Sequence, residues 1–84
     1  MIMARIKHEE LPDGAKDVLS LLRRAHDETG EQWLKRQQLA DVDGKKRLNT
    51  AQQIHLEYLH SLGFIEIERP VGEVAYLYRL IDGE

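Results

Sequence analysis

The sequence predicts one α+β domain built from three helices, one short strand and a C-terminal β-hairpin. Apolar residues recur at helical spacing in three successive segments, residues 11–30, 31–44 and 45–63. In the stretch HLEYLHSLGFIEIERP the apolar spacing changes from three to two at Gly63, which indicates a helix followed at once by a strand. A turn with Pro70 and Gly72 then leads into residues 74–81, which are rich in β-branched and aromatic residues.

The first helix is expected within LPDGAKDVLSLLRRAHDETG. Asp13 is the predicted N-cap, and Asp17 adds negative charge to the first turn, where the helix dipole favours it. Gly30 is expected to end the helix. One face carries the apolar residues Ala15, Val18, Leu19, Leu22 and Ala25. Residues 1–12 are interpreted as an N-terminal arm and residues 13–84 as the domain.

The second helix follows a brief extended piece at Trp33 and Leu34 and takes its apolar side from Leu39 and Ala40. Trp33 is expected to plug the core beneath the hairpin. The turn DVDG then ends this helix.

The third helix is predicted to begin at a capping box formed by Thr50 and Gln53, with Asn49 as a rival cap one residue earlier. Leu56, Leu59 and Leu62 are expected in the core. Gly63 is predicted to have a positive φ, because a left-handed residue reverses the chain most cheaply when it has no Cβ.

Composition limits the functional classes. The chain has 84 residues, of which 42% are hydrophobic and 32% charged, as in an ordinary globular domain with one modest core. It has no cysteine, which excludes disulfides and thiolate metal sites. No apolar run approaches the roughly 20 residues that span a bilayer, and the start MIMARIKHEE has no signal-peptide core. We therefore expect a cytoplasmic protein that does not enter a membrane.

Charge is distributed unevenly along the chain. The formal net charge is −3, which alone argues against an indiscriminate nucleic-acid binder. However, residues 35–47 contain five cationic side chains and only two acidic ones, Asp41 and Asp43. The cations are Lys35, Arg36, Lys45, Lys46 and Arg47. This segment is therefore basic within an acidic remainder.

The order of these elements, with WLKRQQLADV and TAQQIHLEYLHSLGFIEIE as the carrying segments, resembles the winged helix-turn-helix family of DNA-binding domains. The resemblance covers roughly residues 13–81. It implies that the third helix enters the major groove of double-stranded DNA, the second lies across the phosphates, and the hairpin forms a wing against the adjacent backbone. A small transcriptional regulator or accessory factor is the function that this implies.

The same resemblance implies a set of DNA-binding residues. Those at the start of the inserting helix would read bases, and amides can pair bidentately with adenine. They are Asn49, Thr50, Gln52 and Gln53. Lys35, Arg36, Lys45, Lys46 and Arg47 would hold phosphates, with Arg69 on the wing. The chain departs from the family in its long turn DVDGKKRLN and in its wing tip, where Glu68 and Glu73 outnumber Arg69.

Two other functions stay open. A winged-helix module that binds protein rather than DNA is favoured by the acidic total and the acidic wing. An enzyme fragment is least favoured, since no nucleophile elbow, phosphate loop or paired acids are present and no histidine pair has ligand spacing. We expect no catalysis, cofactor or metal.

Two features would bear on the choice of partner. Pairing of the basic groups with Asp41, Asp43 and Glu57 would favour protein binding over DNA. Self-association is a further possibility, through the arm or the exposed side of the strand with Tyr76 and Tyr78.

Overall fold

The computed structural model describes residues 7–69 and 76–81, which form three α-helices and three strands after a short 3-10 turn. In chain order the elements are η1 (His8–Glu10), α1 (Asp13–Thr29), β1 (Leu34–Lys35), α2 (Arg36–Val42), α3 (Thr50–Ser61), β2 (Ile65–Glu68) and β3 (Leu77–Leu80). The predicted α+β class is therefore confirmed for the described residues, and the element order is compatible with a winged-helix layout. The predicted wing tip around Pro70, Gly72 and Glu73 lies outside the described residues.

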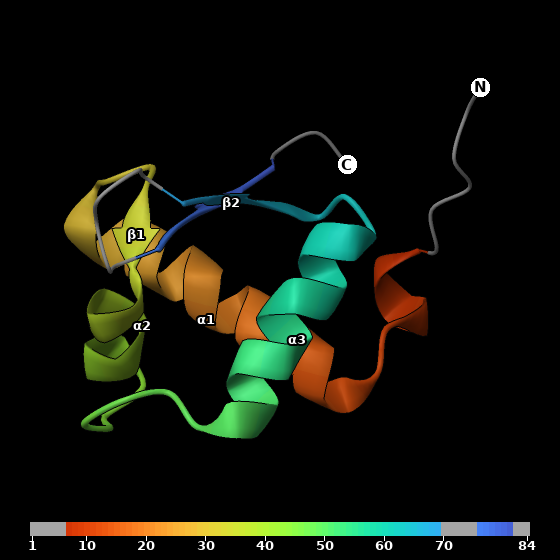
Figure 1. The fold of residues 1–84 in the computed structure, drawn as a ribbon, viewed down its shortest axis with the longest axis horizontal. Helices are drawn as coiled ribbons and strands as arrows, with labels where there is room; N and C mark the ends of the chain where they lie inside the picture. The colour runs from red at the N-terminus through yellow and green to blue at the C-terminus, as the bar shows by residue number, and fades with distance from the viewer. Residues whose placement is uncertain (1–6, 70–75, 82–84) are drawn as a thin grey trace.

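The helices and the sheet enclose one core (Figure 1). α3 crosses in front of α1, α2 lies beside β1, and the sheet runs along one edge of the helices. The strand order is β1-β3-β2, and both pairings are antiparallel. In this register Tyr78 of the central strand lies between Leu34 and Ile67. α1 contacts α2, α3 and β3, so this helix packs against both other helices and the central strand of the sheet.

The ends of α1 follow from its sequence, with one correction. The helix begins at Asp13, so Pro12 is the N-cap and the prediction that Asp13 caps the helix is wrong by one residue. Proline suits this boundary because its fixed φ and missing N–H cost nothing there. Asp13 still places a carboxylate in the first turn. At the other end Gly30 has φ 74° and donates its N–H to His26 O at 2.8 Å, as predicted.

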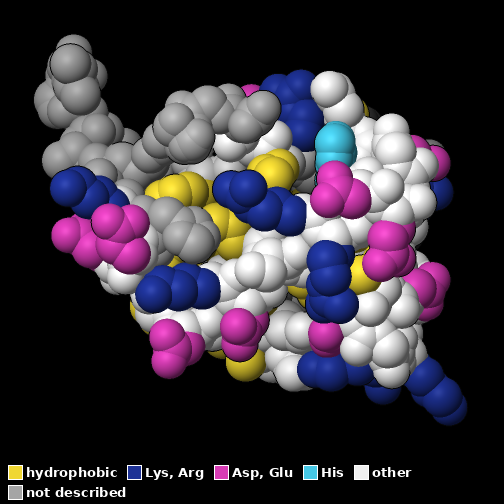
Figure 2. Space-filling view, turned by 180° about the vertical axis from the view of Figure 1, so that it is seen from behind, with side chains coloured by type: hydrophobic (Ala, Val, Ile, Leu, Met, Phe, Trp, Pro, Cys, Tyr) yellow, Lys and Arg dark blue, Asp and Glu magenta, His cyan; other side chains and the backbone are white. Residues whose placement is uncertain are grey.

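α1 is amphipathic, and its outward side is visible from behind the molecule (Figure 2). Lys and Arg side chains are interspersed there with Asp and Glu, so this face carries both signs of charge. The buried side supplies Ala15, Val18, Leu19, Leu21, Leu22 and Ala25 to the core.

The N-cap of α3 is Asn49 rather than Thr50. Asn49 Oδ1 accepts the Gln52 N–H at 2.7 Å, and Gln52 Oε1 accepts the Asn49 N–H at 2.9 Å, which is a complete capping box. The predicted box of Thr50 and Gln53 is therefore wrong, and the rival cap is the correct one. Gln53 instead donates Nε2 to Leu48 O at 3.3 Å.

The change from helix to strand after α3 is a Schellman motif centred on Gly63. This residue has φ 87°, which confirms the predicted positive φ. Its N–H donates to His60 O at 3.1 Å, and the N–H of Phe64 donates to Leu59 O at 3.0 Å. These two bonds satisfy carbonyls that the helix end would leave unpaired, and the chain enters β2 immediately afterwards.

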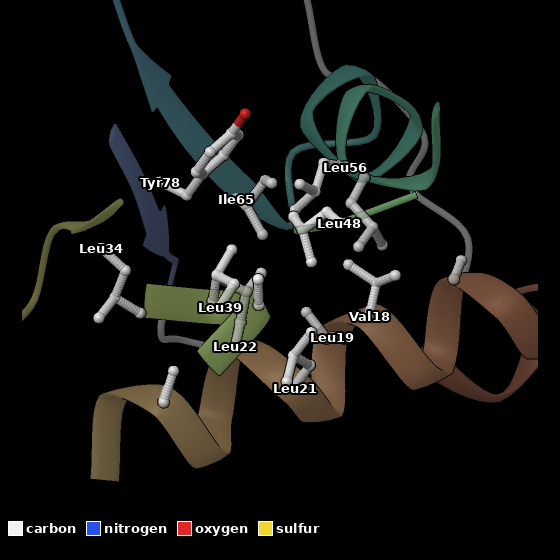
Figure 3. Close-up of a cluster of buried hydrophobic side chains, with 14 of the residues drawn as sticks. Val18, Leu19, Leu21, Leu22, Leu34, Leu39, Leu48, Leu56, Ile65 and Tyr78 are labelled. Carbon is white, nitrogen blue, oxygen red and sulfur yellow. The ribbon is translucent and has the colours of Figure 1, made fainter. Parts of the chain in front are cut away.

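The core gathers leucines from all three helices against Ile65 and Tyr78 of the sheet (Figure 3). Tyr78 is only 1% exposed, so it is not part of the exposed side of β3 that was considered for self-association. Trp33 is also not the predicted core plug, since it is only partly buried. The next residue, Leu34 at the start of β1, is the one that enters the core.

Candidate nucleic-acid interface

The predicted DNA-binding residues lie on two different sides of α3. On the α2 side, Arg36, Arg47 and Gln53 line a hollow of about 290 Å³ together with Gln37 and Leu48. The structure therefore brings together one residue from each of three predicted groups: the start of α2, the turn before α3, and the first turn of α3. We call this hollow the α2–α3 hollow.

On the α1 side, Lys45, Asn49 and Gln52 line a second hollow of about 560 Å³. It also contains Asp17 and Asp43, so it is less basic than the α2–α3 hollow. The side-chain oxygens of Asn49 and Gln52 accept the two hydrogen bonds of the capping box. The Gln52 amide in addition donates Nε2 to Asp43 Oδ2 at 2.9 Å. These two amides thus hold the start of α3.

Arg36 is oriented from within the fold. Its Nε donates to the hydroxyl of Tyr78 at 3.1 Å, and its guanidinium carbon lies 5.3 Å from the centroid of the Tyr76 ring. Tyr78 is buried, so this bond gives its hydroxyl a hydrogen-bond partner and holds the Arg36 side chain in one orientation. The planar guanidinium keeps further donors for a phosphate or a carboxylate.

Arg69, at the end of β2, approaches the same aromatic ring. Its guanidinium carbon lies 4.9 Å from the Tyr76 centroid, and Nη2 lies 3.1 Å from Glu57 Oε2. The hydrogen bond with Tyr76, and then the Glu57 carboxylate, raise the pKa of Arg69. Arg69 is therefore close to α3, but its charge is already paired with the carboxylate of Glu57.

The turn between α2 and α3 presents Lys46 and Arg47. Gln37 Nε2 donates to Lys46 O and to Asp41 Oδ1, each at 3.0 Å, and Lys45 N donates to Ala40 O at 2.9 Å. The longer turn is thus tied to α2 through its backbone, which leaves the lysine and arginine side chains exposed.

Ion pairs take only part of the basic set. Lys45 Nζ lies 3.3 Å from Asp43 Oδ2, and Arg69 pairs with Glu57. Among the described residues, no ion pair involves Lys35, Arg36, Lys46 or Arg47. Four of the six predicted phosphate-binding cations therefore keep an uncompensated charge within the described part of the chain.

The outward face of α3 carries two apolar residues that sequence reasoning did not single out. Ile54 is 60% exposed and Tyr58, one turn later, is 37% exposed. Leu56 and Leu59 face the core. Ile54 is two residues before Leu56, which places it on a different side of the helix from Leu56 and Leu59. This spacing is the signal that could have identified it as exposed.

Two other kinds of feature are absent from the described residues. No helix among them is long and apolar enough to cross a membrane. They also contain no group of three or more His, Cys, Asp or Glu placed to hold a metal ion.

No family model, curated protein or solved structure matches this chain.

Proposed function

We infer that this chain is a winged-helix protein that binds duplex DNA, with α3 directed at the major groove. The observation that carries this proposal is the α2–α3 hollow, where Arg36 and Arg47 flank the exposed first turn of α3 and have no carboxylate partner among the described residues. Two unpaired guanidiniums beside a helix start suit the closely spaced phosphates of a duplex.

The polar side chains at the start of α3 have different roles, and this difference supports the same proposal. Asn49 and Gln52 hold the helix start, whereas Thr50 is exposed and Gln53 lines the α2–α3 hollow. Thr50 and Gln53 are therefore the candidates for base contacts, and Lys35, Arg36, Lys46 and Arg47 for phosphate contacts. Lys45 and Arg69 would first have to exchange a carboxylate for a phosphate, so they are secondary candidates.

A protein partner is the second candidate function. Ile54 and Tyr58 are exposed on α3, and Glu57 lies between them in sequence. An exposed isoleucine and an exposed tyrosine on one face of a helix also suit a protein interface. The pairing of Arg69 with Glu57 supports this alternative, since it removes one cation from the DNA-binding set.

The test is a fluorescence-anisotropy titration of the whole chain with a random-sequence duplex of about 20 base pairs, while salt is raised from about 50 to 200 mM. DNA binding predicts that log affinity falls linearly with log salt, by about 0.9 for each phosphate contact. Absence of salt-sensitive binding would overturn the proposal and leave the protein-binding module. Light scattering on the same samples would test the predicted self-association.

A further inference from the structure

Ile54 is the most exposed of the large hydrophobic residues identified on the described surface, at 60%. It lies in the first half of α3, four residues after Thr50, so the two side chains lie on the same face of the helix. Isoleucine at this position contributes little to the fold, because a β-branched residue is a weaker helix former than alanine and most of its surface remains in water.

The surroundings of Ile54 limit what it can contact. On the α2 side of the helix, Gln53 lines the hollow that also contains Arg36 and Arg47. Ile54 follows Gln53 in the chain, so its apolar side chain lies one helical position from a hollow that contains two arginines without an ion pair among the described residues. This arrangement complements a surface with an apolar group among negative charges. The major groove has this character, because the 5-methyl group of thymine is the apolar feature of its base edges and phosphates line both sides.

Resting on the DNA-binding function proposed above, we propose that Ile54 contacts thymine methyl groups in the major groove and makes thymine the preferred base opposite the middle of α3. Thr50 and Gln53, nearer the helix start, would face the neighbouring bases with polar groups. Specificity would then come from one apolar contact next to polar ones, rather than from the amides of Asn49 and Gln52 that the capping box occupies.

The test begins with the duplex that the wild-type chain enriches from a random pool. Each thymine in it is replaced in turn by deoxyuridine, which lacks only the 5-methyl group. At one or two positions we expect affinity to fall about fourfold, the value of one buried methyl. Ile54→Ala should lose this discrimination, whereas Ile54→Val, which keeps a branched apolar side chain, should retain part of it.

Ile81→Ala is the matched control, since Ile81 is another exposed isoleucine, 39% exposed, and lines a separate hollow with Arg23 and His26. It should keep the full discrimination between thymine and deoxyuridine. Thermal midpoints of the two Ile54 variants should stay close to wild type, because the Ile54 side chain is largely in water.

The possible outcomes separate the two proposals. Salt-sensitive binding with no cost at any deoxyuridine position, or an enriched duplex without thymine, overturns the role of Ile54 and leaves DNA binding standing. Persistence of the discrimination in Ile54→Ala also overturns it, since another residue must then contact the methyl. Failure to bind any duplex overturns the DNA-binding function itself.

Discussion

Gln52 and Asp43 join the start of α3 to the end of α2 through a hydrogen bond of 2.9 Å from Gln52 Nε2 to Asp43 Oδ2. Lys45 Nζ lies 3.3 Å from the same carboxylate oxygen. The Gln52 bond, and after it the Lys45 ammonium, hold the pKa of Asp43 below its ordinary value of 3.8 against the opposing effect of desolvation. The ionised form of Asp43 is therefore the one that ties the two helices together.

We predict that this tie is lost in acid. A depressed carboxylate pKa contributes stability that is fully present above the unfolded-state value and disappears as the pH falls through the lower folded-state value. Asp43→Asn should therefore be less stable than wild type by about 1 kcal/mol at pH 7, and the difference should disappear as the pH falls through the folded-state pKa of Asp43, which lies below 3.8. Urea unfolding across this range measures the difference. A constant difference at every pH would show that the charge of Asp43 does not matter.

Gly63→Val should destabilise the fold by roughly 1–3 kcal/mol, because a β-branched residue is strained at a positive φ. The φ of 87° and the two Schellman bonds place this strain at the junction of α3 and β2. Gly63→Asn is the matched control and should lose less, since asparagine tolerates the left-handed region. Equal thermal midpoints for wild type and the valine variant would contradict the prediction.

The local signals in the sequence predicted the C-terminal ends of α1 and α3 correctly, but they placed the N-cap of each helix one residue too late. Gly30 and Gly63 were identifiable because a left-handed helix end depends on the residue itself. Asn49 and Thr50 are both good N-cap residues, so only the fold could decide which of them caps α3.

The hydrogen-bond partners of the candidate site residues depend on tertiary contacts. Gln52 bonds to Asp43 across a turn, and Arg36 bonds to Tyr78, which is 42 residues away in the sequence, so neither partner could be predicted from local spacing. Charge along the sequence indicated the basic segment, but not which of its members would pair with Asp43.

His55 and Gly14 should be energetically coupled. A Cβ built on Gly14 would lie 2.3 Å from His55 Nε2, so an alanine there must displace the imidazole. In the wild-type background the benefit of alanine to α1 should be cancelled by this clash. With His55→Ala, the same Gly14→Ala change should stabilise the protein by about 0.5–1 kcal/mol. Chemical unfolding of the four proteins of this cycle gives the coupling, and strict additivity would show that the ring moves aside freely.

The hydroxyl of Tyr78 should matter for DNA affinity through Arg36. Tyr78→Phe removes the acceptor of the 3.1 Å bond but leaves the positive charge of Arg36 in place. We expect weaker binding on all sequences with nearly the same dependence on salt, and a stability loss of about 0.5–1.5 kcal/mol. Arg36→Ala should instead lower the salt slope by about 0.9. If Tyr78→Phe lowers the slope as much as Arg36→Ala does, the hydroxyl is needed to keep the phosphate contact itself.

The turn before α3 is the predicted phosphate-binding surface of the proposed DNA complex. Lys46 and Arg47 are exposed, have no ion pair among the described residues, and precede the N-terminus of α3, whose dipole adds partial positive charge. Replacing both with alanine should weaken binding to every duplex and lower the salt slope by about 1.8, or 0.9 for each lost contact. The fold should remain intact, because exposed cations contribute little to stability.

The matched control for this pair is Lys7→Ala with Arg23→Ala, which removes the same charge from exposed positions on η1's N-terminal side and on α1. Because these cations lie away from the α2–α3 hollow, the control should keep the wild-type slope. Charge loss alone would weaken both double variants equally through the long-range field of the protein. A slope that falls only for Lys46→Ala with Arg47→Ala therefore assigns the phosphate contacts to the turn before α3, and equal slopes in both would place them elsewhere.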